Sequence, residues 1–468
     1  MNVARLRAEN LATTQGWRSP AFVDISATGD IAAIHDRAPD AWRGLEVTSL
    51  DGFVIPGLPN LHSHAFQRAM GGHTETWTSD NDDFWSWRNG MYRLAEAVTP
   101  EEHEAIATQL FVEMLEAGMT SVGEFHYLHH DLDGRPYADR AEMSRRLISA
   151  AKTAGIGLTL LPVLYLRGGF DKPPLPSQRR FVHKDADDLL RMIEAVTPEA
   201  NESGVIVGVA PHSLRAVDPA SLARIVEGIR AGVGPEAPIH IHVAEQVAEV
   251  EQCLARLGSR PVAFLLDQHP LDRRWTLVHA THLDEGERTR LAQSGAIAGL
   301  CPTTEANLGD GLFPAREYLA AGGAWGVGSD SHASIDATEE LRLLEYGQRL
   351  MYRRRNVLGH AEEPRVGARL WAGAVQGGAT ALGRSIHGIA VGARADLLAL
   401  DPEHPRLIGH GTDTVLDAFI FGGAREAIAD VIAGGRHVVQ QHRHLEREKA
   451  QRGYTQAIER LLTSRAAT

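Results

Sequence analysis

The segment PGLPNLHSHAFQR, residues 56–68, decides how this chain is interpreted, because it places His62 and His64 directly after a short apolar segment. Two histidines separated by one residue on extended backbone point to the same side, so both imidazoles can reach one metal ion. The pair alone is weak evidence, because two partly exposed loop histidines would fit it about as well. Its meaning depends on what the rest of the chain places beside it.

Eight short apolar segments alternate with longer helical patterns, such as 101–117 and 220–231, through the middle of the chain. The predicted strands are 53–58, 119–124, 157–162, 205–210, 238–243, 275–279, 296–300 and 324–328. Eight strands with intervening helices over about 300 residues predict an α/β fold, the (β/α)8 TIM barrel. A doubly wound sheet is the competing topology. It usually carries a glycine-rich phosphate loop after its first strand, and none follows Leu58.

The two ends of the chain carry a different pattern. Residues 1–52 and 386–440 contain short alternating segments between turn signals: 22–25, 30–34, 396–400, 415–421, 430–433 and 436–439. Neither end has enough strands for a stable sheet of its own. We therefore expect both ends to build one small β-sandwich domain beside a barrel over 53–385, followed by a helical tail over 441–468.

Composition excludes several classes of partner. The 468 residues carry a formal net charge of −13, which argues against nucleic acid or an anionic membrane as the main partner. No segment approaches the roughly 18 apolar residues of a membrane span, and the first residues lack the apolar core of a signal peptide. Cys253 and Cys301 are too few for a disulfide framework. We expect a soluble, cytoplasmic protein, and homo-oligomerisation stays open.

Three further residues that can bind metal end predicted strands. His242 ends the fifth strand in HIHVAE, His279 the sixth in LVHATH, and Asp330 the eighth in WGVGSDSH. Barrel sites are built at the carboxyl ends of strands, so these side chains should converge with His62 and His64. Imidazole and carboxylate ligands suit zinc with water completing its shell, whereas structural zinc favours cysteine-rich sites.

Glu245 lies three residues beyond His242. A carboxylate there can shuttle protons without binding the metal. The alternative is a glutamate in the first turn of a helix, which the helix dipole favours. The nearby histidines favour the catalytic interpretation. His240 shares the face of His242, and we interpret it as a packed or hydrogen-bonded barrel residue.

These residues together resemble the amidohydrolase superfamily, and HVAE with His279 resembles its deaminase branch. The segment GATALGRSIHGIAVGARADLLALD, residues 378–401, is similar to that superfamily's return from barrel to β-domain. Binuclear members carry a carboxylated lysine at the end of the fourth strand, but this chain has no lysine between Lys184 and Lys449. The resemblance therefore implies one divalent ion per chain, expected to be Zn²⁺, with the ligands His62, His64, His242 and Asp330.

A narrower resemblance points to the deaminase-branch enzymes that hydrolyse N-formimidoyl-L-glutamate to N-formyl-L-glutamate and ammonia in histidine degradation. It rests on PGLPNLHSHAFQRAMGG (56–72), DDFWSWRNGMY (82–92), GEFHYLHH (123–130), APHSLRAV (210–217) and CPTTEANLGDG (301–311). The resemblance implies a small-molecule substrate with two carboxylates, bound by Gln67, Arg88, Tyr127, His212 and Arg215. Arginine suits bidentate carboxylate capture, although a surface ion pair is the usual role of any single arginine.

The expected reaction needs no organic cofactor. We expect His279 and Asp330 to remove a proton from water that the ion activates, and Glu245 to pass a proton to the departing nitrogen. One alternative is a related deaminase acting on a purine, pyrimidine or triazine ring, which two arginines and an aromatic content of 6% disfavour. A remote alternative is a non-catalytic barrel that serves as an interaction protein.

Overall fold

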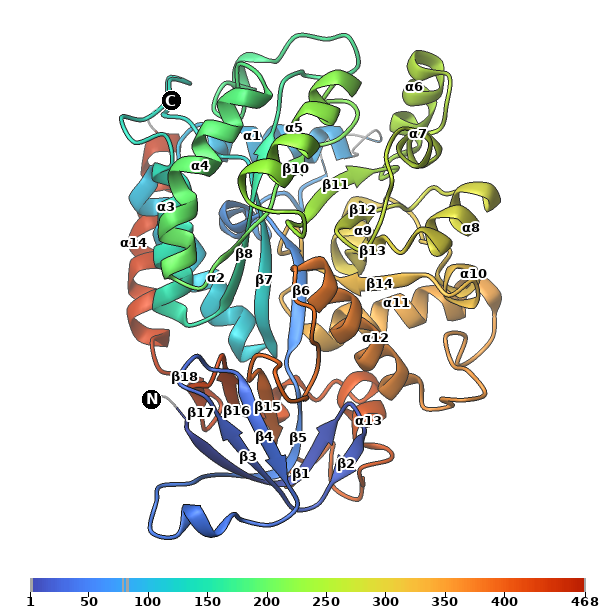
Figure 1. Cartoon of the computed structure of the whole chain (residues 1–468). Coiled ribbons are helices and arrows are strands. Elements are labelled where there is room, and N and C mark those ends of the chain that lie inside the picture. The colour runs from blue at the N-terminus through green and yellow to red at the C-terminus, as the bar shows by residue number, and fades with distance from the viewer. Residues whose placement is uncertain (1–2, 78–79, 81–83, 467–468) are drawn as a thin grey trace.

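The computed structural model describes residues 3–77, 80 and 84–466. Residues 82 and 83 of the segment 82–92 therefore lie outside the described residues. Figure 1 shows strands surrounded by helices in the upper part of the molecule, and a separate group of strands below, beside the N-terminus. The structure has the predicted α/β class.

Two parallel sheets form the upper part. One contains β6 (Leu58–Ser63), β7 (Met119–His126), β8 (Gly157–Leu164), β9 (Ile206–Val207) and β10 (Ala210–Pro211); the other contains β11 (Ile239–Val243), β12 (Trp275–His279), β13 (Ile297–Leu300) and β14 (Ala324–Val327). Parallel bridges from Val209 to Ile239 and from Ser63 to Asp330 link the two sheets at both edges. This arrangement is consistent with a barrel whose strands end at one rim.

Helices cover the outside of these strands (Figure 1). They are α1 (Phe84–Ala95), α2 (Pro100–Glu116), α3 (Glu142–Ala154), α4 (Ala186–Glu202), α5 (Pro219–Gly232), α6 (Val247–Leu257), α7 (Pro261–Gln268), α8 (Glu285–Ser294), α9 (Pro302–Leu308), α10 (Ala315–Ala320), α11 (Ala337–Tyr352) and α12 (Val366–Ala381), with 3₁₀ turns η1 (Asp40–Trp42), η2 (Ala65–Met70), η3 (Pro176–Gln178) and η4 (Arg425–Ala427). Local sequence explains their starts. Thr99 and Glu102 form a capping box at α2, with Pro100 at the first helical position.

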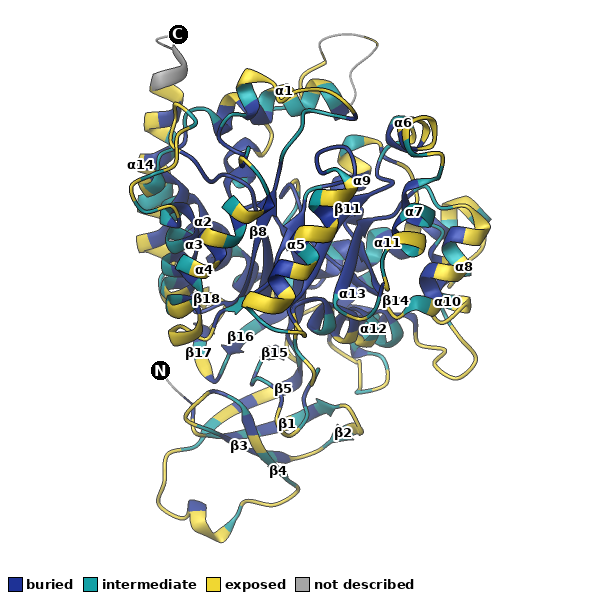
Figure 2. Cartoon of the chain, turned by 45° about the horizontal axis from the view of Figure 1, so that its top comes forward, coloured by how far each residue is buried: buried dark blue, intermediate teal, exposed yellow. Residues whose placement is uncertain are grey.

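Burial follows the same layers. Every residue of β7 and β8 is buried, as expected where helices cover a parallel sheet. Figure 2 shows buried residues along the central strands and exposed residues on the outer faces of the helices around them. No helix in the described part of the chain is both long enough and apolar enough to cross a lipid bilayer.

Strands from both chain ends share one sheet, as the sequence predicts. Within the described residues it has nine strands: β1 (Arg5–Thr13), β2 (Gly16–Arg18), β3 (Ala21–Ile25), β4 (Ile31–His35), β5 (Thr48–Pro56), β15 (Leu397–Leu400), β16 (Ile428–Ala433), β17 (Arg436–Gln440) and β18 (Arg443–His444). The ends join where β15 pairs antiparallel with β5, with Leu397 opposite Pro56. Hydrogen bonds thus connect these strands into one continuous sheet.

Two strands predicted from the sequence are wrong. Residues 53–56 end β5 in the lower sheet, and Gly57 separates them from β6, which contains His62. Both strands are short and apolar, so periodicity could not divide them. Residues 415–421 form helix α13 (Val415–Phe421), whose buried Val415, Ala418 and Phe419 follow helical spacing. The tail residues 447–466 form α14 (Arg447–Ala466), which packs beside α2.

Candidate active site

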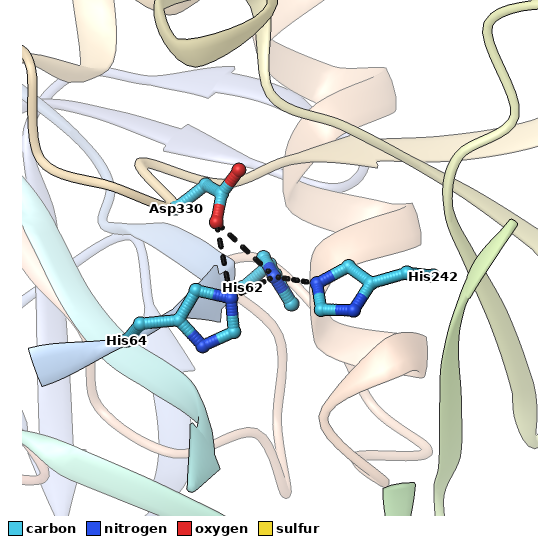
Figure 3. A group of neighbouring side chains, drawn as sticks. All are labelled: His62, His64, His242 and Asp330. Atoms are coloured by element: carbon cyan, nitrogen blue, oxygen red, sulfur yellow. Dashed lines mark hydrogen bonds and ion pairs between the residues drawn. The ribbon is translucent and has the colours of Figure 1, made fainter. Parts of the chain in front are cut away.

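Four side chains that can bind metal converge where β6, β11 and β14 end (Figure 3). His62 Nε2 lies 3.2 Å from His64 Nε2 and 3.0 Å from His242 Nε2. Asp330 Oδ1 lies 3.4 Å from His62 Nε2 and 3.2 Å from His64 Nε2. All four residues are buried. The structure therefore brings together the four ligands predicted from the sequence.

The outer ring nitrogens determine which atoms face inward. His64 Nδ1 lies 2.9 Å from the carbonyl oxygen of Phe125, and His242 Nδ1 lies 3.1 Å from that of His212. A carbonyl oxygen only accepts, so each Nδ1 carries the hydrogen and each Nε2 offers a lone pair. Burial lowers the pKa of His62 to about 3 and lowers the pKa values of His64 and His242. Converging lone pairs repel one another, whereas a divalent cation satisfies them, so this donor set fits a metal ion.

Hydrogen bonds below the ligands hold β6 against its neighbours. Asp330 N donates to the carbonyl oxygen of His62 at 3.0 Å, and His64 N donates to that of Asp330 at 3.2 Å. Ser63 Oγ donates to Glu124 Oε2 at 2.6 Å. The ligands therefore sit on a rigid support, which is what a preformed metal site requires.

Strained backbone gathers at the same rim. Ala244, His279, Ala280, Asp330 and His332 have φ values between 47° and 67°, the left-handed region that non-glycine residues rarely adopt. Such conformations cost about 1–3 kcal/mol each and cluster at functional sites. They lie where β11, β12 and β14 end, so the chain turns sharply as it presents these side chains.

His279 lies beside the four ligands, close to two carboxylates. Its Nε2 is 3.7 Å from Asp330 Oδ2 and 3.7 Å from Glu245 Oε1. Burial alone would lower the pKa of His279, but Glu245, Glu305 and Asp330 together raise it to about 10. His279 is therefore suited to donate a hydrogen bond from Nε2 into the space between them.

Glu245 is a buried acid between two cationic groups. Its Oε2 lies 3.8 Å from Arg215 Nη2, and its Oε1 faces His279. Burial raises the pKa of Glu245, and the charges of His279 and Arg215 oppose that rise. A carboxyl group in such surroundings is suited to exchanging a proton with a bound molecule.

Sequence analysis missed Glu305. Its Oε1 lies 3.3 Å from His279 Nδ1 and accepts from the backbone N–H of Cys301 at 2.9 Å. A carboxylate at this position fixes the hydrogen on Nδ1 and aims Nε2 toward Asp330 and Glu245. The segment 301–311 contains Glu305, but no spacing within it shows which histidine the side chain faces.

A cavity opens beside the metal-binding group, with about 540 Å³ of empty space between its lining atoms when the solvent at its mouth is included. The five predicted substrate-binding residues all line it: Gln67, Arg88, Tyr127, His212 and Arg215. Glu245, His279 and Asp330 face the same space. The structure thus places every site residue predicted from the sequence in or directly beneath this cavity. The roles assigned to them stay predictions.

Two guanidinium groups in the cavity make few ion pairs or hydrogen bonds with the described residues. Arg88 Cζ lies 4.3 Å and Arg215 Cζ 5.7 Å from the ring centroid of Trp85. Among residues 3–77, 80 and 84–466, Arg88 makes no ion pair, and Arg215 pairs only with Glu245 at 3.8 Å. Arg215 Nε is buried without a hydrogen-bond partner. Buried cations normally have acceptors, so the guanidinium of Arg215 has room for a further acceptor.

Neutral hydrogen-bonding groups complete the wall. Gln67 Nε2 donates to Tyr127 Oη at 2.6 Å, while Gln67 Oε1 is buried without a partner. His212 Nδ1 lies 3.0 Å from Ser213 Oγ. His240 is not part of this wall: its Nε2 lies 2.8 Å from the carbonyl oxygen of Ala381, as expected for a hydrogen-bonded barrel residue.

Comparison with known proteins identifies the family. The amidohydrolase family matches residues 53–438 of this chain. The chain belongs to the amidohydrolase family. Within that family, a formimidoylglutamate deiminase of Pseudomonas aeruginosa is 48% identical over 456 residues, which cover 97% of this chain and 99% of that enzyme. An 8-oxoguanine deaminase of Pseudomonas aeruginosa is 28% identical over 82% of each chain. Both resemblances noted in the sequence are thus confirmed.

Solved amidohydrolase structures show the same fold. A crystal structure of an amidohydrolase from Brucella melitensis matches with a TM-score of 0.91 and 46% identity, over 98% of this chain and 99% of that one. An adenosine deaminase from Xanthomonas campestris with bound zinc matches with a TM-score of 0.79 and 21% identity, over 99% of each chain.

Proposed function

We propose that this amidohydrolase converts N-formimidoyl-L-glutamate and water to N-formyl-L-glutamate and ammonia. The observation that carries the proposal is a pair of arginines with few partners in the cavity beside the metal-binding group: Arg215, which is buried, and Arg88, which is half-buried. Two substrate carboxylates would neutralise Arg88 and Arg215, while the formimidoyl carbon reaches the catalytic residues. The 48% identity to a formimidoylglutamate deiminase supports the same substrate.

A single divalent ion, Zn²⁺, is part of this proposal. His62, His64, His242 and Asp330 would hold it, since three imidazole nitrogens and a carboxylate oxygen form a donor set that zinc accepts. The absence of lysine between Lys184 and Lys449 disfavours the bridge of a second ion. When bound, such an ion supplies Lewis acidity that activates water at neutral pH.

The reaction replaces the terminal nitrogen of the formimidoyl group with oxygen from water. Asp330 accepts a proton from the attacking water, and His279, whose Nε2 lies 3.7 Å from Asp330 Oδ2, assists by donating a hydrogen bond to that water. Glu245 passes to the departing nitrogen first the proton taken from the water and then the proton of the hydroxyl group left on the carbon, so both protons of the water end on that nitrogen. The C–N bond then breaks, the C=O bond forms, and ammonia leaves. Arg88 and Arg215 hold the two carboxylates, so the reacting carbon stays beside Glu245.

The finer architecture follows from the same family. We infer a (β/α)8 TIM barrel, which the bridges at both sheet edges support. We also infer that the lower sheet folds over as a small β-sandwich domain. Its support is a separate hydrophobic core that includes Leu6, Val23, Leu397 and Ile432.

Ammonia release across a small substrate panel tests the function. N-formimidoyl-L-glutamate should be the best substrate, its aspartate homologue weaker, and guanine and cytosine inert. Activity on a purine or pyrimidine without activity on formimidoylglutamate would instead identify a ring deaminase. A metal-loaded enzyme that releases ammonia from none of them would contradict the proposal.

Arg215→Met should lower kcat/KM for formimidoylglutamate by about 30-fold to several thousand-fold, because one partner of a desolvated charge pair is lost. Metal content should not change. An analogue with the paired carboxylate amidated should be processed about equally by both enzymes. Arg256→Met serves as the control, since Arg256 is an exposed arginine paired with Asp171. Equal losses on the charged and amidated substrates would mean that Arg215 supports the fold rather than binds the carboxylate.

Glu305→Met should lower kcat roughly tenfold to a hundredfold with little change in KM, because His279 loses the acceptor that orients it. Glu305→Gln keeps an acceptor and should recover most of the rate. Steady-state kinetics of both variants, with metal content as a control, separates positioning from folding. If the Met and Gln variants lose the same activity, Glu305 does not act by orienting His279.

A further inference from the structure

A second cavity lies at the opposite end of the barrel strands, between the barrel and the lower sheet. The empty space between its lining atoms, with the solvent at its mouth included, is about 330 Å³, so it suits only a small ligand. Gly57 and Pro59 line it at the start of β6, whereas His62 lies near the other end of that strand. Arg384, Arg394 and Ser121 also line it. None of these residues belongs to the catalytic machinery proposed above.

Arg384 is a cation without an anionic partner in this cavity. Within the described ranges, its guanidinium makes no ion pair and no hydrogen bond, and its Nε is buried. Arg384 Nη2 and Arg394 Nη1 both lie 3.0 Å from the point where a Cβ on Gly157 would stand, so the two guanidinium groups meet over this glycine. Burial and the charge of Arg394 lower the pKa of Arg384 to about 10.

Ser121 supplies an independent indication of a ligand. Its side chain is 1% exposed, and its Oγ is buried without a hydrogen-bond partner. Ser121 pairs with Gly157 in the parallel register of β7 and β8, so it faces the same side of the sheet as the two guanidinium groups. A buried hydroxyl without a partner is uncommon in native proteins and calls for an acceptor.

The carboxylates near Arg384 do not accept hydrogen bonds from its guanidinium. Asp396 lines the cavity, but its Oδ1 is bonded to Arg394 Nη1 and accepts from the backbone N–H of Gly434 at 2.9 Å. Asp30, the other acid near Arg384, accepts from Thr28 Oγ1 at 2.7 Å. Both carboxylates are thus bonded to other groups, and neither forms an ion pair with Arg384 within the described residues.

We propose that this cavity binds a small oxyanion, inorganic phosphate or a carboxylate group, held by the Arg384 guanidinium and the Ser121 hydroxyl. Such an ion supplies the acceptor that both the Arg384 guanidinium and the Ser121 hydroxyl lack, in a charge-assisted contact with the guanidinium. It would also connect the barrel strand β7 to the segment that leads from α12 into the lower sheet. Its expected effect is therefore on stability, because binding to the folded chain alone shifts unfolding by mass action.

Thermal unfolding of the full-length protein, titrated with sodium phosphate or sodium acetate at constant ionic strength, tests the proposal. We expect at least one anion to raise Tm by about 2–5 °C with a dose response that saturates. A response to phosphate alone identifies phosphate as the ligand, and a response to acetate identifies a carboxylate-accepting site. If neither anion gives a saturating shift, the proposal is wrong.

Arg384→Gln and Ser121→Ala separate site binding from the general stabilisation that phosphate gives many proteins. The saturating shift should disappear in Arg384→Gln and weaken in Ser121→Ala, while metal content stays unchanged. Arg342→Gln is the matched control, since Arg342 donates only to the carbonyl oxygen of Ile420 within the described residues and lies outside the cavity. The full shift should persist in that control. A full shift in Arg384→Gln and Ser121→Ala would overturn the proposal.

Discussion

Asp330→Asn should retain no stoichiometric metal and show no measurable ammonia release from formimidoylglutamate. Asp330 is the only carboxylate in the group of four ligands, and its Oδ1 lies within 3.4 Å of both His62 and His64. The amide has nearly the same shape but carries no charge, so a divalent cation loses its one anionic ligand there. Metal analysis of the washed protein and the ammonia assay measure the two losses together.

Asp310→Asn provides the matched control. Asp310 is also buried near the site, where burial first and then the charge of Glu245 raise its pKa to about 8, but it is not one of the four ligands. The control should keep its metal. If Asp330→Asn retained one ion per chain, the ligand set would be wrong even if activity were lost. Removing metal from the wild-type enzyme with a chelator should abolish activity, and Zn²⁺ should restore it.

The sequence was sufficient to predict that the candidate metal-binding side chains converge, because barrel geometry places them by rule. His242, His279 and Asp330 each end or follow a strand that periodicity identifies, and parallel strands of a barrel end at one rim. The predicted convergence is present even though the first strand was misplaced. His62 lies within β6 rather than after it, but its position near the strand's carboxyl end is the same.

Residues that act through a partner on another element could not be found in this way. Glu305 is 26 positions from His279, and only the packing of α9 against the end of β12 brings the two together. Arg384 Nε and Ser121 Oγ likewise lack hydrogen-bond partners only because of how the chain folds around them. Nothing in the sequence links these two positions. Sequence patterns predict which elements form, whereas hydrogen-bond satisfaction depends on how they pack.

Glu245→Gln should keep its metal yet lose about 10²- to 10⁴-fold in kcat, the range expected when a positioned proton donor is removed. Glu245 is not among the four ligands, so metal content should stay at the wild-type level. The amide fills the same volume and can still face Arg215, so KM should not rise. A fall in KM is expected because Glu245 no longer competes with a substrate carboxylate for Arg215, which lies 3.8 Å away.

Glu249→Gln is the control that separates proton transfer from general loss of buried charge. Glu249 is also buried and near Arg215, and its Oε2 accepts from the backbone N–H of Glu245 at 3.3 Å. Glutamine keeps an acceptor there, so kcat should stay within about tenfold of wild type. If both variants lost the same activity, the rate would depend on the negative charge around Arg215 rather than on proton transfer by Glu245. If Glu245→Gln stayed near the wild-type rate, another group would have to protonate the departing nitrogen, and His279 would be the next candidate because its Nε2 lies within 3.7 Å of Glu245 and Asp330.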